Sequence, residues 1–447
     1  MVPHLQNAYW KRAIKIVREV DIIYLYEHAA RELDVACAVA ALLETNYGLS
    51  VEIVQWPVEF GRIVHTIRPK KIVILPYCYI EEDFSPLLAY WRGVHYVNLT
   101  WEQLLYPGNE KAKMPRGDFV IKDVVHHAWS EHYVDILKKN GVSNKHIFLN
   151  GQPAYTLYNK PYSSYFKSKE ELAKQYSLDI EKKWIFFPEN YNWAFYMKNR
   201  LDMFIRDGQT PDQVNTMKEF CDVSLSQVLH WFEKAIHTDA EIEIIVRPRP
   251  STTVDEFISA VRNSLGKIPT GLHLIQDETV REWILASDVI FSSHSTSLIE
   301  ASIAEKQAYM LEPYPVPETL QAIWHQFLPH IKSYDDFLDI CMLDKNNNTI
   351  DDRLAGWARS NLMSKGDSIR NLVDYFFALS VTPVSEPESS VLNTRTRYPH
   401  VWIWVIYRNL RRLYFYWRTK AVEPVFVKDM VSKPEIDSRK RKWLQIL

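Results

Sequence analysis

Two segments in the second half of the chain combine residue types that bind phosphate. Arg247-Pro248-Arg249-Pro250 follows the apolar run EIEIIV. After the apolar run SDVIF comes a stretch rich in hydroxyl side chains, made of Ser292, Ser293, His294, Ser295, Thr296 and Ser297. Guanidinium groups and hydroxyls are good partners for phosphate oxygens, and open α/β sheets bind ligands at the carboxyl ends of their strands. The pattern therefore predicts a site for a nucleotide phosphate.

The elements that must position these residues alternate between strands and helices. In the first half we expect strands over residues 21–27, 49–56, 70–79, 93–101, 118–129 and 145–152, with helices over 30–47, 61–68 and 130–142. In the second half we expect strands over 182–190, 241–250, 271–276, 288–293 and 307–313. The helices there are expected over 225–238, 255–265, 279–287 and 297–306, with further helices from 319 to 380. Such alternation predicts parallel sheets with helices on both faces.

The chain is long enough for two hydrophobic cores, since its 447 residues exceed the usual size of one domain. A connector rich in Pro, Tyr and Ser, residues 152–168, separates the two alternating regions. We expect an α/β protein of two Rossmann-like doubly wound domains that face a central cleft. The expected boundaries are 1–160 and 161–380, followed by a tail at 381–447.

Composition argues against several classes of protein. The formal net charge is only −2, which disfavours a general nucleic-acid binder. The sequence contains neither GxGxxG nor GxxxxGK[ST], and it has no DxD triplet. Its four cysteines are far apart and form no CxxC pair, so neither zinc nor disulfide bonds are expected. No metal and no resident cofactor are predicted.

The N-terminal residues carry scattered charges and no apolar signal core, and no apolar run reaches the ~18 residues of a spanning helix. A cytoplasmic protein is expected. Residues 395–420 differ from the rest, with seven Arg or Lys, eight aromatic residues and no acidic residue. A basic aromatic helix of this kind is typical of an anionic membrane interface. The alternative is a helix packed across the two domains.

Four places in the sequence resemble GT-B glycosyltransferases, and more narrowly the bacterial transferases that build capsule and lipopolysaccharide, relatives of Kdo- and sialyltransferase-like families. These places are residues 27–34 (EHAARELD), 125–153, 247–250, and 292–297 with Glu300 behind them. The resemblance extends over residues 20–380. One position departs from the family, because Arg249 stands where a His usually precedes the second proline. An arginine binds phosphate but cannot readily donate a proton, so help for the leaving group would be electrostatic.

The resemblance implies metal-independent transfer of a sugar from a nucleotide-activated donor to a lipid-linked surface glycan. CMP-Kdo or another CMP-ulosonic acid is the favoured donor, with UDP- and GDP-sugars left open. Such an enzyme would work at the inner face of the cytoplasmic membrane, as a peripheral protein, without nucleic acid. Two alternatives stay open: a CDP-glycerol-type glycerophosphotransferase, and a noncatalytic scaffold of a polysaccharide assembly complex. A non-hydrolysing sugar-nucleotide epimerase is less favoured, because it would not need the basic aromatic tail.

Several residues are candidates for contact with the substrates. Transfer to a hydroxyl needs a base, for which Glu27 is the first candidate and His28 and Glu32 the next. In the second domain the expected donor-binding residues are Arg247, Arg249, Ser292, Ser293, His294, Ser295, Thr296, Glu300, Glu189 and Asn190. One of the hydroxyls is expected to cap the helix that follows. For each residue the alternative is a solvated turn or helix face.

Overall fold

The chain forms two parallel six-stranded sheets. The structure is a computed structural model that describes residues 17–447, apart from 57–58, 60–62, 65, 82–83, 108, 240, 251, 344–349, 365 and 390–428. The first sheet has the order β2-β1-β3-β4-β5-β6. Its strands are β1 (Arg18–Tyr26), β2 (Val51–Gln55), β3 (Ile67–Leu75), β4 (His95–Asn98), β5 (Val124–Ala128) and β6 (Ile147–Leu149).

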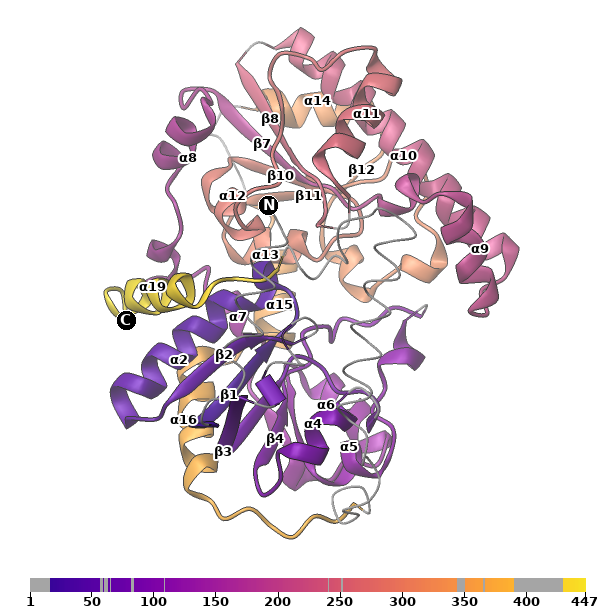
Figure 1. Cartoon of the computed structure of the whole chain (residues 1–447). Helices are drawn as coiled ribbons and strands as arrows, with labels where there is room; N and C mark the ends of the chain where they lie inside the picture. The colour runs from indigo at the N-terminus through magenta and orange to yellow at the C-terminus, as the bar shows by residue number, and fades with distance from the viewer. Residues whose placement is uncertain are drawn as a thin grey trace, which may run out of the picture.

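The second sheet has the order β12-β11-β10-β7-β8-β9, and all its neighbouring strands are parallel. Its strands are β7 (Lys183–Pro188), β8 (Ile242–Arg247), β9 (Leu272–Leu274), β10 (Val289–Ser292), β11 (Gln307–Leu311) and β12 (His330–Ile331). The two sheets form separate lobes, one above the other in Figure 1. We call them the first and the second lobe.

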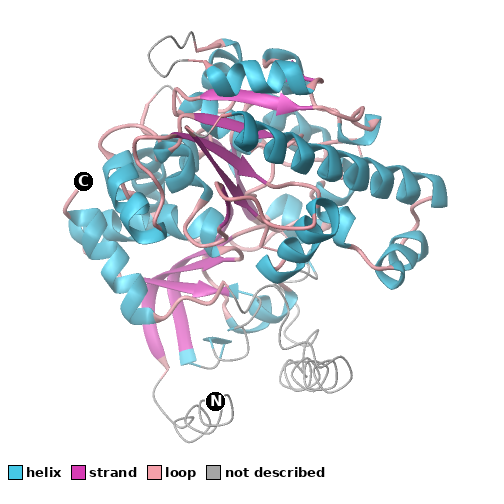
Figure 2. Ribbon diagram, turned by 90° about the horizontal axis from the view of Figure 1, so that it is seen from above, coloured by secondary structure: helices cyan, strands magenta, loops and turns pink. Residues whose placement is uncertain are grey.

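Helices flank the strands of both lobes (Figure 2). In the first half of the chain they are η1 (Ala29–Leu33), α2 (Asp34–Tyr47), α4 (Ser85–Tyr90), η3 (Glu110–Lys113), α5 (Asp118–Lys122), α6 (Glu131–Lys139), η4 (Asn144–His146), α7 (Pro153–Thr156), η5 (Tyr162–Tyr165) and α8 (Lys169–Tyr176). The later ones are η6 (Asn192–Phe195), α9 (Lys198–Arg206), α10 (Pro211–Thr238), α11 (Val254–Leu265), α12 (Val280–Ala286), α13 (Ser297–Ile303), η7 (Glu318–Leu320), η8 (Ile323–Phe327), α14 (Tyr334–Met342), α15 (Arg353–Asn361), α16 (Ser368–Val381) and α19 (Lys433–Leu444).

Local sequence explains where the helices beside the expected phosphate site begin. Thr253 and Thr279 start α11 and α12 with capping boxes, in which each threonine hydroxyl accepts from a backbone amide and a glutamate three residues later returns the bond. Both helices follow directly on strands β8 and β9. The loops that connect these strands to their helices are therefore short, and they lie at one edge of the second sheet.

The chain returns to the first lobe near its end. Helices α16 and α19 both pack on α2 (Figure 1). Ile369 and Phe376 of α16, with Ile436 and Trp443 of α19, are buried in the hydrophobic core of the first lobe. Helix α16 thus packs on the first lobe, although the expected boundaries assign its residues to the second domain.

Several expected elements differ in the structure. Residues 67–68, expected at the end of a helix, begin strand β3, and residues 330–331, expected in a helical region, form strand β12. Residues 118–129, expected as one strand, form helix α5 and then strand β5, because Gly117 with φ +90° starts a turn and α5 buries Phe119 and Val120. Residues 319–327, expected as a helix, form the short 3-10 turns η7 and η8. Pro317 and Pro329 flank that stretch and restrict the backbone beside it. The basic aromatic segment 395–420 lies outside the described residues.

Candidate functional site

A cleft of about 590 Å³ lies between the two lobes. It is lined by segments that follow β1, β4, β5 and β6 in the first lobe and β7, β8, β9 and β10 in the second. Two parallel sheets therefore direct their carboxyl ends toward one cavity, which is where open α/β sheets bind ligands. A volume of this size accommodates a nucleotide or a ligand of similar size.

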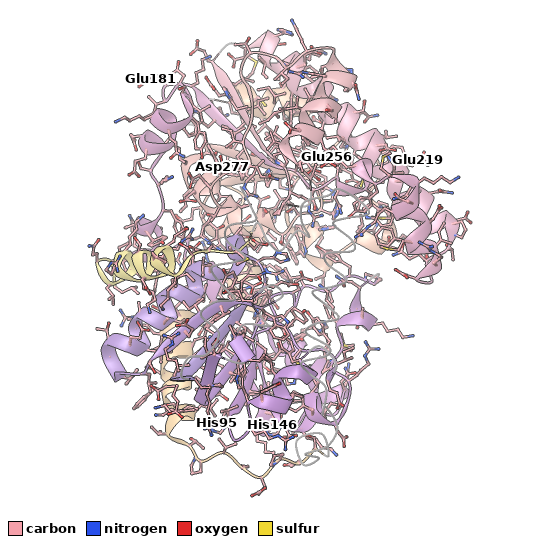
Figure 3. The ribbon with its side chains drawn as sticks, viewed as in Figure 1. His95, His146, Glu181, Glu219, Glu256 and Asp277 are labelled. Carbon is pink, nitrogen blue, oxygen red and sulfur yellow. The ribbon has the colours of Figure 1, made fainter. Side chains whose placement is uncertain are left out.

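A second hollow, of about 540 Å³, lies at the opposite edge of the first lobe. It is bordered by His95 and His146, which mark that end of the molecule in Figure 3. Both residues lie at the amino ends of strands β4 and β6. This edge is the one that α/β sheets do not ordinarily use, so we place the candidate functional site in the cleft between the lobes.

Arg249 lies in the cleft, and the hydrogen-bond partners of its guanidinium are neutral. Its Nη1 donates to Asn190 Oδ1 at 2.9 Å and to Asn192 Oδ1 at 3.1 Å. Among the described residues its guanidinium forms no salt bridge with a carboxylate, although Glu189 Oε2 accepts from its backbone amide at 3.4 Å. A cation held in place by amide oxygens keeps its charge available for an anionic ligand.

Arg247 also lines the cleft, but its guanidinium points away from that of Arg249. Its Nε and Nη2 donate to the backbone oxygen of Glu278, at 3.2 and 3.0 Å. Glu278 follows β9, whereas the partners of Arg249 follow β7, and these strands lie on opposite sides of β8. Burial lowers the pKa of Arg247 to about 10, which still leaves it charged at neutral pH. The two guanidiniums are therefore bound by different loops, that of Arg247 by the loop after β9 and that of Arg249 by the loop after β7.

The hydroxyl-rich loop divides into a buried half and a cleft half. Ser292 and Ser293 are fully buried, and the Ser292 hydroxyl donates to the backbone oxygen of Pro188 at 2.7 Å. Ser295 and Thr296 line the cleft, together with Ser297. The N-cap position of α13 is Thr296, whose side chain makes no capping bond; the Ser295 hydroxyl accepts from the Ser297 amide at 3.3 Å instead.

His294 and Glu189 line the cleft in different electrostatic states. Burial lowers the pKa of His294 to about 3, and the charge of Arg249 contributes to the same shift. The imidazole is therefore neutral at physiological pH. Burial raises the pKa of Glu189, while its hydrogen bond from the Tyr191 amide and the charge of Arg249 oppose that shift. Asn190 reaches the cleft beside them as a partner of Arg249.

Glu300 lies in a buried network that joins the lobes. Its Oε2 accepts from the Tyr158 hydroxyl at 2.5 Å, and burial raises the pKa of the carboxyl. Beside it Arg281 Nη1 donates to Asp34 Oδ2, in the first lobe, at 2.7 Å. Asp34 and Arg281 are both nearly inaccessible to solvent. Glu300 and Arg281 both line the cleft. The ion pair between Arg281 and Asp34 therefore joins the two lobes next to the cavity.

On the first-lobe side, the three expected catalytic residues occupy one turn after β1. Glu32 is completely buried, and its carboxylate accepts from the backbone amides of Glu27 and His28 at 2.9 and 3.3 Å. Arg31 donates to Glu32 at 2.7 Å, to Glu27 at 3.2 Å and to Glu102 at 2.7 Å. The buried Glu32 carboxylate thus stabilises the backbone of this turn. Glu27 and His28 remain partly exposed beside Arg31, which lines the cleft.

The sequence interpretation did not single out several residues that line the cleft: Arg281, Asn192, Trp193, Tyr106, Lys113 and Tyr155. Tyr106 and Lys113 belong to the loop after β4, and Asn192 and Trp193 to the loop after β7. For Tyr106, Tyr155, Asn192 and Trp193, the available signal was their position shortly after expected strands. Arg281 offered none, because it lies inside a helix whose register is fixed by packing.

Among the described residues, no group of three or more His, Cys, Asp or Glu side chains is arranged to hold a metal ion. None of the helices in the described part of the chain is both long and apolar enough to cross a membrane.

No protein-family model and no curated protein sequence matches this chain. Solved structures do resemble it. A Listeria monocytogenes protein assigned as a UDP-N-acetylglucosamine 2-epimerase aligns with a TM-score of 0.50 and 11% identity, over 83% of this chain and 99% of that one. The wall teichoic acid polymerase TagF, solved as a point variant with CDPG, aligns with a TM-score of 0.50 and 11% identity, over 80% of this chain and 88% of its own.

A glycosyltransferase from Rickettsia africae aligns over 82% of this chain and 100% of its own, at 12% identity and a TM-score of 0.46. The first two likenesses, with the two parallel sheets and the cleft between them, define the fold as GT-B. The expected fold class, an α/β protein with two doubly wound domains, is confirmed. At these identities the likeness establishes the fold and leaves the reaction open.

Proposed function

We propose that the protein is a glycosyltransferase that transfers a sugar from a nucleotide-activated donor to a surface glycan. The observation that carries the proposal is Arg249, a cation in the cleft between two GT-B lobes whose guanidinium is held by the amide oxygens of Asn190 and Asn192. Ser295, Thr296 and the neutral His294 line the same cleft. This surface suits a phosphate or diphosphate with a nucleoside attached.

In the proposed reaction, an acceptor hydroxyl attacks the anomeric carbon of the donor sugar. A base on the first lobe, Glu27 or His28, takes the hydroxyl proton as the new bond forms. The bond from the anomeric carbon to the phosphate oxygen breaks, and its electron pair leaves with the nucleotide. Arg249 stabilises the negative charge on that leaving group, and Glu300 accepts hydrogen bonds from the ribose. The proposed steps need no metal and no resident cofactor.

The donor that we favour is CMP-Kdo or another CMP-ulosonic acid, because the Arg-Pro-Arg-Pro segment and the hydroxyl-rich loop resemble those of Kdo- and sialyltransferase-like families. The second candidate is a CDP-glycerol-type glycerophosphotransferase, which the likeness to TagF with CDPG supports. Both candidates use a cytidine nucleotide. A noncatalytic scaffold of a polysaccharide assembly complex should bind none of these nucleotides.

The test is a thermal-shift panel of CMP, CDP, UDP and GDP on the wild-type protein and on Arg249→Ala. A matched control is Arg262→Ala, which changes an exposed arginine on α11 away from the cleft. We expect one nucleotide to raise the melting temperature of the wild type and of the control but not of Arg249→Ala. CMP as the strongest ligand favours an ulosonic acid donor, and CDP favours glycerol phosphate. If no nucleotide raises the melting temperature of the wild type, the enzyme proposal is wrong.

We further propose that the protein works at the inner face of the cytoplasmic membrane, on a lipid-linked glycan acceptor. The sequence of residues 395–420 supports this. Replacing Arg408, Arg411 and Arg412 by Ser should weaken binding to anionic vesicles about 100-fold, since each basic residue near such a surface contributes roughly 1 kcal/mol. Sedimentation with vesicles containing phosphatidylglycerol measures this, and unchanged binding contradicts it. Point substitutions are needed because deleting the whole C-terminus would remove Trp443 from the first-lobe core.

A further inference from the structure

The last part of the chain reaches the turn that carries the proposed base. Asp429 follows the final gap in the described residues and lies beside His28, 401 positions earlier in the sequence. Its Oδ2 is 2.9 Å from His28 Nδ1, and its Oδ1 accepts from the Ala29 amide at 3.0 Å. Both oxygens of this carboxylate therefore bind the turn after β1.

The backbone around Asp429 is fixed as well. The Tyr26 hydroxyl donates to the backbone oxygen of Asp429 at 3.0 Å and accepts from the Val431 amide at 3.2 Å. Further along, Trp443 of α19 stacks on Tyr165 with ring centroids 3.9 Å apart. The carboxylate is thus presented by a segment anchored in the first-lobe core, and its side chain is only 13% exposed.

This contact determines which nitrogen of His28 carries the proton. A carboxylate oxygen can only accept, so the proton of the neutral imidazole resides on Nδ1 and the lone pair on Nε2. Nε2 lies 3.8 Å from Glu27 Oε2, and that same oxygen accepts from Arg31 Nη2 at 3.2 Å. The His28 side chain is 31% exposed and belongs to the same turn as Ala30 and Arg31, which line the cleft.

We propose that Asp429 is a positioning residue for His28, and that His28 is the group that takes the acceptor proton. The proposal rests on the transferase function proposed above. In the step, the proton of the acceptor hydroxyl moves to His28 Nε2 while the hydroxyl oxygen bonds to the anomeric carbon and the nucleotide leaves with its electron pair. Asp429 keeps Nδ1 protonated and stabilises the imidazolium that results. The acceptor side of the site is therefore completed by residues from the far end of the chain.

The test compares Asp429→Asn with Asp437→Asn, a matched control on α19 whose carboxylate pairs with Lys433 at 3.9 Å. In protein labelled with ¹⁵N-histidine, the ring nitrogen shifts at mildly alkaline pH report the tautomer of His28, whose signals are assigned by comparison with His28→Gln. Turnover is measured as release of nucleotide from a donor that carries the nucleotide identified by the thermal-shift panel. The nucleotide-induced rise in melting temperature is recorded for every variant.

We expect the wild type and Asp437→Asn to hold His28 with the proton on Nδ1, and Asp429→Asn to lose that preference. We also expect kcat of Asp429→Asn to fall about 100-fold or more, with the acceptor KM and the nucleotide shift unchanged. An unaltered tautomer, an unaltered kcat, or a loss confined to KM would overturn the proposal. If the wild type binds no nucleotide, the transferase function fails instead, and the tautomer measurement still decides whether Asp429 orients His28.

Discussion

The two walls of the cleft differ in the partners of their arginines. On the first lobe, Arg31 is already neutralised by Glu27, Glu32 and Glu102. On the second lobe, the guanidinium of Arg249 donates to the amide oxygens of Asn190 and Asn192, which carry no charge. A compensated network orients groups without attracting an ion, whereas a cation with neutral partners attracts an anion. The difference favours the second lobe for the phosphate and the first for the neutral acceptor hydroxyl.

The largest expected effect is a difference in the free energy of unfolding between variants of Arg31 and Arg249. Arg31→Ala leaves the completely buried Glu32 without its cation and should destabilise the fold by about 3 kcal/mol or more. Arg249→Ala should change stability by less than about 1 kcal/mol while lowering nucleotide affinity on the order of 30-fold. Chemical unfolding and nucleotide titration measure the two effects. Arg68→Ala is the control for Arg31, because its side chain is 68% exposed. Equal destabilisation by both cleft variants would break the comparison.

A pH experiment tests the electrostatics of the second-lobe wall. The pKa of His294 is about 3 in the folded protein and takes its ordinary value of 6.5 in the unfolded chain, so below pH 6.5 the unfolded state binds one more proton. Stability is therefore lost as the pH falls. His294→Asn should lose roughly 2 kcal/mol less than the wild type between pH 7 and pH 5. The exposed His132→Asn serves as control, and parallel curves for all three proteins would show that His294 is not held neutral.

The smallest expected effect concerns Glu300. If its carboxylate accepts from ribose hydroxyls, the wild type should bind CMP more tightly than 2′-deoxy-CMP by about 1 kcal/mol, and Glu300→Ala should bind both alike. Glu300→Gln keeps an acceptor oxygen and the contact with Tyr158, so it should retain part of the preference. Isothermal titration measures the difference. A preference that survives in Glu300→Ala would assign the ribose to another group.

Much of the fold was predictable because strands buried on both faces leave continuous apolar runs. Ile244, Ile245 and Val246 of β8, for example, are fully buried, and the run that contains them marked the strand correctly. The prediction failed at residues 118–129, where an apolar run of similar appearance bends at Asp123 between a helix and a strand. Apolar runs of this length suit a buried helix face as well as a strand, so tertiary packing decided.

The sequence by itself determined the two α/β lobes and put arginines and hydroxyls at the ends of strands, since alternation, apolar runs and strand ends are local properties. Only the tertiary structure decided that Ser292 turns inward while Ser295 lines the cleft, and that Arg281 of the second lobe pairs with Asp34 of the first. It also brought Asp429 to His28. Contacts between residues hundreds of positions apart depend on how whole elements pack, and no local pattern in the sequence encodes them.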